Sequence, residues 1–195
     1  MSDFFAHSSA IIEPGSTLKT GSKVWHFCHV RSGATLGENV VLGKDVYVDD
    51  EVVIGNNSRI QNGVSIYKGV HISPWCFIGP HVIFTNDLSP RAGRRNWKVT
   101  PTYLKTGMSI GAGAIIRCGV TLGEFSMIGA GAMVTKDVPP FHLSVGLPAK
   151  VERMICACGE TFLPLNTVNS ELIRKCCEEN LQNETLILAK TILNL

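Results

Sequence analysis

Large apolar residues recur at every sixth position along most of the chain. From Ile12 this step of six reaches Phe84 without a slip, and after an interruption it resumes at Leu104 and continues to Val134. A period of six matches neither the 3.6-residue period of an amphipathic helix nor the two-residue alternation of a half-buried strand. It fits a short strand followed by a tight turn, because residues that tolerate a positive φ fill the fourth position of most hexads. Examples are Gly33, Asn57 and Gly63.

Three such strand–turn units close a triangular coil of 18 residues. Successive coils stack at about 4.8 Å, the ordinary spacing of hydrogen-bonded strands. The first-position aliphatic residues then fill the interior, and the small fifth-position residues, such as Cys28 and Cys76, fit near the corners. The sequence therefore predicts an all-β protein, a parallel β-helix of about six coils over residues 1–150 with a long loop inserted at 85–103. Residues 151–195 form a tail that covers one end, with a helix expected over 170–193.

This repeat resembles that of the hexapeptide-repeat acyltransferases, and the resemblance covers residues 12 to about 150. The segment Val145-Gly146-Leu147-Pro148-Ala149-Lys150 is similar to the G-x-P-A-K signature that borders the coenzyme A groove in that family. The resemblance implies a left-handed parallel β-helix and acetyl-CoA as cosubstrate. It also implies a homotrimer with its active sites between subunits.

Composition and charge exclude several other classes of protein. Lys and Arg number 18 against 16 Asp and Glu, so the formal net charge is only +2 and gives no reason to expect nucleic acid or a membrane surface as a partner. No apolar run approaches the roughly 18 residues of a membrane span, and the first residues show no secretory signal pattern, so we expect a cytoplasmic protein. The seven cysteines are therefore expected to be reduced thiols rather than a disulfide framework.

Residues 18 apart fall in one column, so the period predicts which side chains lie together. His29 and Ser65 share one column of outward-facing strand residues, and Arg31 and Tyr67 share a column of turn residues at the adjacent edge. The register breaks at this edge, and a structureless segment as long as 85–103 in a compact fold is typical of a functional loop. Its cationic side chains are candidate contacts for phosphate or carboxylate groups.

Three further segments narrow the resemblance. Residues 24–30 (VWHFCHV), 60–67 (IQNGVSIY) and 82–91 (VIFTNDLSPR) are similar to the nucleotide-sugar 3-amine N-acetyltransferases. The resemblance is greatest to enzymes that acetylate UDP-2-acetamido-3-amino-2,3-dideoxy-glucuronate for bacterial surface polysaccharides such as the lipopolysaccharide O-antigen. Enzymes for dTDP-linked 3-amino-deoxyhexoses share much of this pattern. The sequence therefore leaves open whether the nucleotide is uridine or thymidine, and whether C6 of the sugar carries a carboxylate or a methyl group. A non-catalytic β-helix scaffold is the third hypothesis, and the polar loop and the intact G-x-P-A-K segment argue against it.

The implied chemistry is attack of a neutral amine on a thioester, which needs orientation more than it needs a base. In one branch of the family a histidine follows the equivalent asparagine, whereas here the next residue is Asp87. We therefore expect Asn86 to be the catalytic residue, acting by orientation. His29 is the candidate if the reaction does use a base. The expected substrate-binding residues are His29, Arg31, Asn62, Ser65, Tyr67 and Arg94. The expected cofactor-binding residues are Arg117, Gly119, Lys136, Gly146, Pro148 and Lys150.

The spacing of histidines and cysteines argues against a bound metal. Carbonic anhydrases built on the same β-helix need three gathered histidines, and no third histidine falls in the column that would join His26 and His29. A structural zinc site normally takes two C-x2–4-C pairs. In this chain Cys156-Ala157-Cys158 and the adjacent pair Cys176-Cys177 do not have that spacing, so we expect helix packing and a free thiol rather than metal ligands.

Overall fold

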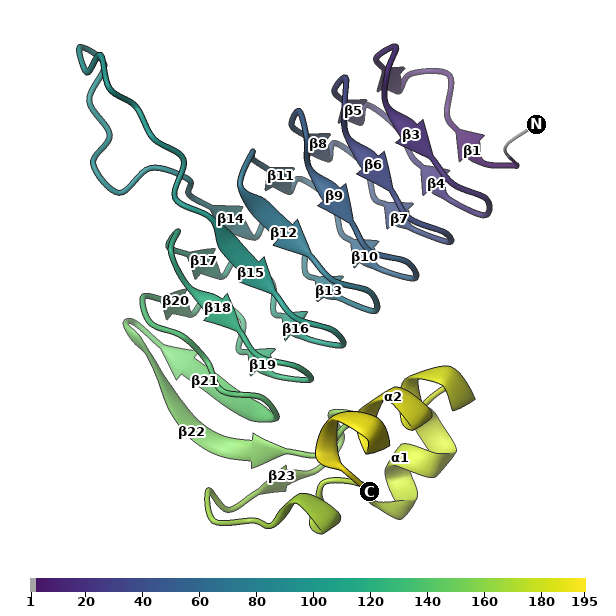
Figure 1. Cartoon of the computed structure of the whole chain (residues 1–195), viewed down its shortest axis with the longest axis vertical. Helices are drawn as coiled ribbons and strands as arrows, with labels where there is room; N and C mark the ends of the chain where they lie inside the picture. The colour runs from purple at the N-terminus through teal and green to yellow at the C-terminus, as the bar shows by residue number, and fades with distance from the viewer. Residues whose placement is uncertain (1–2) are drawn as a thin grey trace.

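The computed structural model describes residues 3–195, in which three parallel sheets form the sides of a triangular column (Figure 1). We call them sheets A, B and C, and the chain visits them in the repeating order B, C, A. Sheet C has six strands, one for each complete coil, as the repeat predicts. The all-β solenoid expected from the sequence is confirmed.

The strands are mostly two residues long and pair with the copies one coil away. Sheet B contains β2 (Ile11–Ile12), β5 (His29–Val30), β8 (Tyr47–Val48), β11 (Ser65–Ile66), β14 (Ile83–Phe84), β17 (Ile115–Ile116) and β20 (Met133–Val134). Sheet C contains β3 (Thr17–Leu18), β6 (Thr35–Leu36), β9 (Val53–Ile54), β12 (Val70–Ile72), β15 (Thr102–Leu104) and β18 (Thr121–Leu122). The parallel part of sheet A contains β1 (Phe5–Ala6), β4 (Lys23–Val24), β7 (Val41–Leu42), β10 (Arg59–Ile60), β13 (Phe77–Ile78), β16 (Ser109–Ile110) and β19 (Met127–Ile128).

The second residue of each short strand points into the column and forms the core. Ile54, Ile60 and Ile66, one from each sheet, are completely buried. The preceding residue of each strand faces outward, as Val53 does at 51% exposure. Burial of one large aliphatic side chain per strand stabilises every coil by the same hydrophobic contribution, about 1.5–3 kcal/mol for each side chain.

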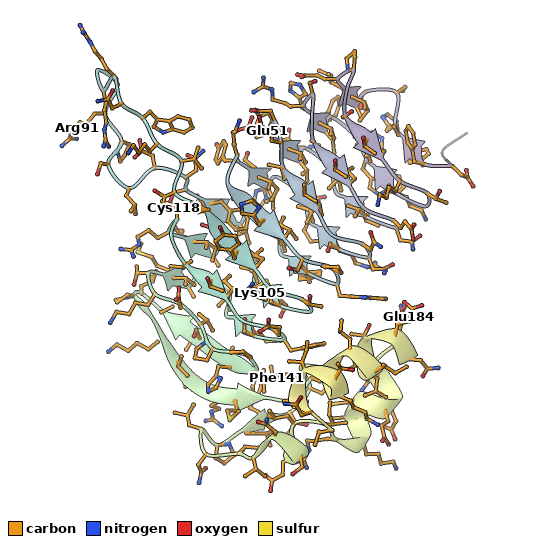
Figure 2. All side chains as sticks on the ribbon, in the orientation of Figure 1. Glu51, Arg91, Lys105, Cys118, Phe141 and Glu184 are labelled. Carbon is orange, nitrogen blue, oxygen red and sulfur yellow. The ribbon has the colours of Figure 1, made fainter. Side chains whose placement is uncertain are left out.

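The long loop leaves the column between β14 and β15 and extends away from the coils (Figure 1). It occupies residues 85–101, two fewer than expected, because β15 already begins at the buried Thr102, which pairs with Val70. Figure 2 places Arg91 on the part of the loop that is far from the column and Cys118 in the coil beside its root. The backbone N–H of Cys118 donates to Thr85 Oγ1 at 2.9 Å.

The chain after the last coil forms a cap and a small helical tail. Strand β21 (His142–Gly146) continues sheet A beside β19, and β22 (Ala149–Ile155) and β23 (Phe162–Leu163) extend it with antiparallel pairing. The boundary that the sequence analysis placed after residue 150 therefore lies inside β22. No helix among residues 3–195 is long and apolar enough to cross a bilayer.

The single helix expected over 170–193 is instead divided into three pieces: the 3-10 turn η1 (Asn169–Glu171), α1 (Lys175–Asn180) and α2 (Asn183–Leu193). Leu181 and Gln182 have extended backbone angles, which end α1 and begin α2. This break lets Ala189 and Leu193 of α2 share one buried cluster with Cys177 of α1, together with Phe125 and Phe141 at the end of the column.

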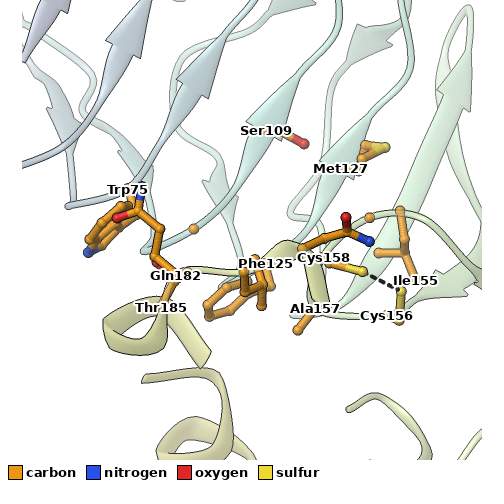
Figure 3. Close-up of a pocket in the computed structure, with 14 residues that line it drawn as sticks. Trp75, Ser109, Phe125, Met127, Ile155, Cys156, Ala157, Cys158, Gln182 and Thr185 are labelled. Carbon is orange, nitrogen blue, oxygen red and sulfur yellow. Dashed lines mark hydrogen bonds between the residues drawn. The ribbon is translucent and has the colours of Figure 1, made fainter. Parts of the chain in front are cut away.

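A cavity of about 290 Å³ remains where the tail meets the last coils (Figure 3). Trp75, Phe125 and Met127 contribute to its wall from the column, and Cys156 and Thr185 contribute from the tail.

Candidate active site

The turns that connect sheet B to sheet C stack along one edge of the column, which we call the B–C corner. It consists of residues 13–16, 31–34, 49–52, 67–69, the loop 85–101, 117–120 and 135–137. The strands of sheet B that lead to this corner pair residues 18 apart: His29 with Tyr47, Tyr47 with Ser65 and Ser65 with Ile83. The columns derived from the 18-residue period are therefore the columns of the structure.

His29 is paired with a carboxylate. Its Nε2 lies 2.7 Å from Glu13 Oε1, while Glu13 Oε2 accepts the backbone N–H of Ser32 at 2.9 Å. The Ser32 N–H, followed by the hydrogen bond with His29, lowers the pKa of Glu13, so the carboxylate is charged and holds the imidazole. Glu13 is a functional candidate that the sequence analysis missed. The period could have found it, because Glu13 lies 18 residues before Arg31 in the same column.

Arg31 is held by acidic neighbours on the next coil. Its Nη1 lies 3.0 Å from Asp49 Oδ1 and 3.4 Å from Asp50 Oδ1. The Tyr47 hydroxyl donates to the same Asp49 oxygen at 2.9 Å. Burial by itself raises the pKa of Asp49, but the N–H groups of Lys68 and Asp50 and the Tyr47 hydroxyl outweigh it, so the pKa is lowered. Arg31 therefore has a defined position, with 41% of its side chain exposed to a ligand.

Replacing Asp49 with asparagine is expected to flatten the acid dependence of stability. The unfolded pKa is about 3.9 and the folded pKa is lower. The ionised carboxylate therefore stabilises the folded state above the unfolded value, and this contribution is lost as the pH falls through the folded pKa. Urea unfolding at several pH values below about 5 measures the effect. A decline of the unfolding free energy that is parallel in Asp49→Asn and the wild type would exclude Asp49 as its source.

Lys68 lies one coil beyond Asp49 and two coils beyond Arg31. Its Nζ lies 2.9 Å from Asp50 Oδ2 and 3.0 Å from Glu51 Oε2, and these two carboxylates raise its pKa. Lys68 is therefore a cation rather than a base. Ser65 and Tyr67, both expected to bind substrate, lie on the same coil as Lys68. Tyr67 is 38% exposed, and its ring centroid lies 6.2 Å from that of Tyr47.

Asn86 stands at the root of the loop. Its backbone oxygen accepts the N–H of Thr100 at 2.9 Å, which closes the loop, and its Nδ2 donates to the Lys68 carbonyl at 3.4 Å. Gly69 allows this closure, because its φ is +94° and a Cβ there would collide with Val99 Cγ1. The Asn86 side chain is thus oriented across two coils. Among the described residues its side-chain hydrogen bond uses Nδ2, so Oδ1 can accept a hydrogen bond from a ligand.

Two charged residues of the loop interact with each other and not with Asn86. Arg94 Nη1 lies 3.2 Å from the Ser89 carbonyl and 3.9 Å from Asp87 Oδ1. The same Asp87 oxygen accepts the backbone N–H of Ser89 at 2.8 Å. Arg94, expected to bind substrate, therefore supports the conformation of the loop.

The expected cofactor residues lie beyond Asn86 toward the cap. Lys136, Pro148 and Lys150 line one groove of about 270 Å³ between the last B–C turn and the β21–β22 hairpin. Gly146 is the last residue of β21 before the turn of this hairpin, with a φ of +97°. Arg117 is exposed one coil before Lys136, while the N–H of Gly119 donates to the Pro101 carbonyl at 3.1 Å and so supports the returning loop.

One residue expected to bind substrate lies at a different corner of the column. Asn62 belongs to a turn between sheets A and B, where its Oδ1 accepts the backbone N–H of Lys44 at 2.8 Å. The structure therefore does not bring Asn62 to the B–C corner.

His29 and Asn86 cannot act on the same atom within one chain. The strand residue in the column of His29 that immediately precedes the loop is Ile83, three coils away. At the ordinary strand spacing this separates the two side chains by about 14 Å along the column. They can contact opposite parts of one extended ligand.

Comparisons with known proteins find the same repeat in other families of proteins. The family described as "Bacterial transferase hexapeptide (six repeats)" matches residues 51–86, and "Hexapeptide repeat of succinyl-transferase" matches 33–68 and 109–136. The dTDP-3-amino-3,6-dideoxy-alpha-D-galactopyranose 3-N-acetyltransferase of Aneurinibacillus thermoaerophilus is 36% identical over 75 residues, which are 38% of this chain and 38% of that protein. The chain therefore carries the hexapeptide repeats that these family models describe, and it is similar over two fifths of its length to a sugar N-acetyltransferase.

The relatives that this chain resembles do not all acetylate the same kind of atom. The galactoside O-acetyltransferase of Lactococcus lactis is 37% identical over 92 residues, which cover 40% of this chain and 43% of that enzyme. The matches thus span about two fifths of the length of these two acyltransferases.

Two solved structures share the fold. The N-acyltransferase AntD from Bacillus cereus, crystallised with dTDP and coenzyme A, superposes with a TM-score of 0.59 and 20% identity over 79% of this chain and 91% of AntD. A hexapeptide transferase family protein from Anaplasma phagocytophilum gives a TM-score of 0.55 and 17% identity over 98% of this chain and 87% of that one. The left-handed parallel β-helix expected from the sequence is confirmed.

Proposed function

We propose that this chain is a hexapeptide-repeat acyltransferase, an acetyl-CoA-dependent N-acetyltransferase that acts on the amine of a nucleotide-linked amino sugar. The observation that carries the proposal is the interrupted B–C corner. There the oriented Asn86 side chain lies between polar side chains on the preceding coils and a groove that presents Lys136 and Lys150. The 3-N-acetyltransferase from Aneurinibacillus supports a nucleotide-sugar amine as acceptor.

The finer assignment is to a 3-amino sugar of the UDP-2-acetamido-3-amino-2,3-dideoxy-glucuronate type, used in bacterial surface polysaccharides. It rests on the segments at 24–30, 60–67 and 82–91. A dTDP-3-amino-deoxyhexose is the alternative acceptor, and the similarity to an enzyme for such a sugar favours it.

In the proposed reaction the neutral amine attacks the acetyl carbonyl of acetyl-CoA. A carbon–nitrogen bond forms, the carbon–sulfur bond breaks, and the surplus proton of the nitrogen passes to the departing thiolate to give free coenzyme A. Asn86 Oδ1 accepts an amine N–H and thereby directs the nitrogen lone pair at the carbonyl. Such orientation can contribute several kcal/mol, up to about 7–11 in model reactions.

The remaining residues bind the two ends of the substrates. His29, Arg31 and Tyr67 contact the nucleotide sugar along the coils before the loop, and Lys136 and Lys150 pair with phosphates of coenzyme A. We expect the protein to work in the cytoplasm as a homotrimer, the trimer being what the family resemblance implies. A second copy would then close the groove. Apolar side chains that face outward on sheet B support such packing, with Ile11 at 58% and Ile83 at 52% exposure.

A thiol-release assay with matched acceptors tests the proposed function. The full chain is supplied with acetyl-CoA and with UDP- or dTDP-sugars that differ only in bearing a 3-amine, a 4-amine or a 3-hydroxyl. We expect turnover with a 3-amine and no turnover with the hydroxyl. Turnover of the hydroxyl would overturn the amine mechanism, and a chain that neither binds acetyl-CoA nor releases thiol with any acceptor would be a scaffold.

Replacing His29 with alanine is expected to raise KM for the nucleotide sugar about tenfold, the loss of one charge-assisted hydrogen bond, with little change in kcat. Glu13→Gln should change KM in the same direction by a smaller factor, because it only releases the imidazole. The double variant should be no worse than His29→Ala. Steady-state kinetics in both substrates measures this.

The matched control is His71→Ala, which removes another exposed imidazole, one that stacks on Tyr103 at 4.9 Å in sheet C. A collapse of kcat in His29→Ala with KM unchanged would make His29 the general base and contradict its role as a binding residue.

A further inference from the structure

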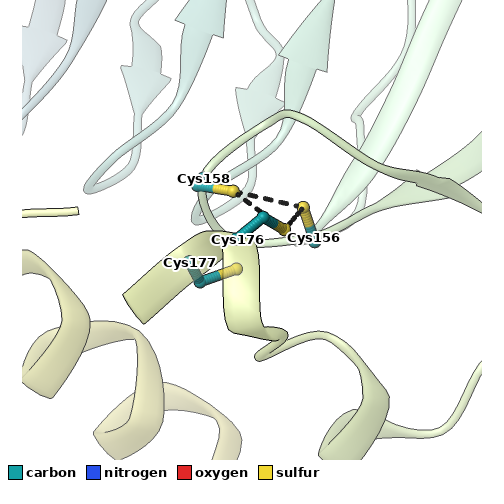
Figure 4. Close-up of side chains that lie close together, drawn as sticks. All are labelled: Cys156, Cys158, Cys176 and Cys177. Atoms are coloured by element: carbon teal, nitrogen blue, oxygen red, sulfur yellow. Dashed lines mark hydrogen bonds between the residues drawn. The ribbon is translucent and has the colours of Figure 1, made fainter. Parts of the chain in front are cut away.

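Four cysteine thiols from two separate segments meet in the tail (Figure 4). The Sγ atoms of Cys156, Cys158, Cys176 and Cys177 all lie within 4.8 Å of one another. Cys156 and Cys158 are 3.4 Å apart, Cys158 and Cys176 3.5 Å, and Cys156 and Cys176 3.8 Å. Among residues 3–195 this is the one group of three or more His, Cys, Asp or Glu side chains with such a geometry.

The fold brings these thiols together in spite of their unusual spacing in the sequence. Cys156 and Cys158 lie on the turn that follows β22, where Gly159 has a φ of +85° and donates its N–H to the Cys156 carbonyl at 2.9 Å. Cys176 and Cys177 lie in the first turn of α1. The N–H of Ala157 donates to the Leu172 carbonyl at 3.0 Å, which fastens the first segment to the chain just before α1.

Polar groups around the cluster suit negatively charged sulfur. The backbone N–H of Thr161 donates to Cys156 Sγ at 3.2 Å, and the Thr161 hydroxyl lies 3.6 Å from Cys176 Sγ. Arg174 and Lys175 line an open groove together with Cys176. Hydrogen bonds to ligating atoms and nearby cations are the usual outer environment of a thiolate site.

We propose that Cys156, Cys158, Cys176 and Cys177 bind one zinc ion as a tetrahedral four-thiolate site. Zinc–sulfur bonds of about 2.3 Å place tetrahedral sulfurs about 3.8 Å apart, close to the separations in this cluster. Soft thiolates in tetrahedral geometry select zinc among the common divalent ions. The spacing of the cysteines in the sequence argued against such a site, and the folded tail supplies the convergence that the spacing did not reveal.

Four protein ligands leave no open coordination position, so the site is structural and independent of the proposed acetyl transfer. Its position explains what it would stabilise. The tail contains a helix of six residues and one of eleven, neither with a side-chain N-cap hydrogen bond, and segments of about 40 residues usually need metals, disulfides or partners to fold. The zinc would join the β22–β23 turn to α1 and hold the tail against Phe125 and Phe141 at the end of the column.

Metal analysis of the intact protein tests the proposal directly. The full chain is produced without a histidine tag and purified without chelator or added metal, and its zinc content is measured by mass spectrometry. We expect about one zinc per chain, released when a mercurial reagent titrates the thiols. Replacement by Co²⁺ should give the charge-transfer and visible bands of a tetrahedral four-thiolate complex.

Cysteine variants locate the site. Cys158→Ser and Cys176→Ser should each lose most of the bound zinc and make residues beyond β22 sensitive to limited proteolysis, with the β-helix still resistant. Cys28→Ser is the matched control, because Cys28 is buried in the column and donates to the Gly43 carbonyl at 2.9 Å, a bond that a serine hydroxyl can also make. It should retain the zinc of the wild type.

Three results would overturn the proposal. One is a wild-type chain with all seven thiols free and no affinity for added Zn²⁺ or Co²⁺. A second is fewer than seven thiols after denaturation without reductant, which would indicate a disulfide within the cluster. The third is iron in place of zinc in the isolated protein, which would keep the four-thiolate site but reject the assigned metal.

Discussion

Replacing Asn86 with alanine is expected to lower kcat/KM for acetyl transfer about 100-fold or more, a loss of roughly 3 kcal/mol of transition-state stabilisation. The side chain is held across two coils by its 3.4 Å hydrogen bond to the Lys68 carbonyl. Its removal leaves the amine bound but not directed at the thioester, so kcat should fall more than KM rises. Steady-state thiol release measures both, and the unfolding midpoint should change little because one part-buried hydrogen bond contributes only about 1 kcal/mol.

Asn56→Ala is the matched control for this substitution. Asn56 is a half-buried corner asparagine whose Oδ1 accepts the N–H of Glu38 at 3.0 Å, at a different corner from the loop. It should retain full activity. An Asn86→Ala enzyme with the kcat/KM of the wild type would refute orientation by Asn86, and equal losses in both variants would point to a general effect on the coils.

Replacing Ile54 with alanine is expected to lower the free energy of unfolding by about 2–5 kcal/mol. Ile54 is completely buried between its neighbours in adjacent coils, Leu36 and Ile72, and a cavity there cannot collapse because every coil has the same register. Urea unfolding followed by circular dichroism measures the change.

The control is the adjacent residue on the same strand. Val53 faces outward at 51% exposure, so Val53→Ala should change the unfolding free energy by less than about 0.5 kcal/mol. Equal losses at Val53 and Ile54 would contradict the inward and outward assignment that follows from the six-residue period.

Much of the fold could be predicted because the repeat fixes both the strand positions and their stacking. Once Ile12 to Phe84 are aligned in steps of six, the pairing of Ser65 with Ile83 and the position of Asn86 beside Lys68 follow from counting. The same counting places the loop at the B–C corner. Local periodicity determines long-range contacts here because the parallel strand pairings of the column join equivalent positions of neighbouring coils.

Two kinds of feature could not be predicted: the structure beyond the end of the repeat, and the side-chain contacts that depend on rotamers. The period puts Glu13 in the column of Arg31, but the 2.7 Å bond to His29 depends on rotamers. The break at Leu181 follows from tertiary packing of the tail, which overrides the helical pattern of that segment. The convergence of the four cysteines depends on the same packing, so their spacing in the sequence was a poor guide.

The most direct test of the central claim is a crystal structure of the chain with coenzyme A and the 3-amino nucleotide sugar that the activity assay selects. We expect the coenzyme sulfur and the sugar amine to meet at the root of the loop, with the amine nitrogen within hydrogen-bonding distance of Asn86 Oδ1 and the phosphates of the coenzyme toward Lys136 and Lys150. Ligands bound at another corner of the column, with Asn86 touching neither of them, would contradict the account.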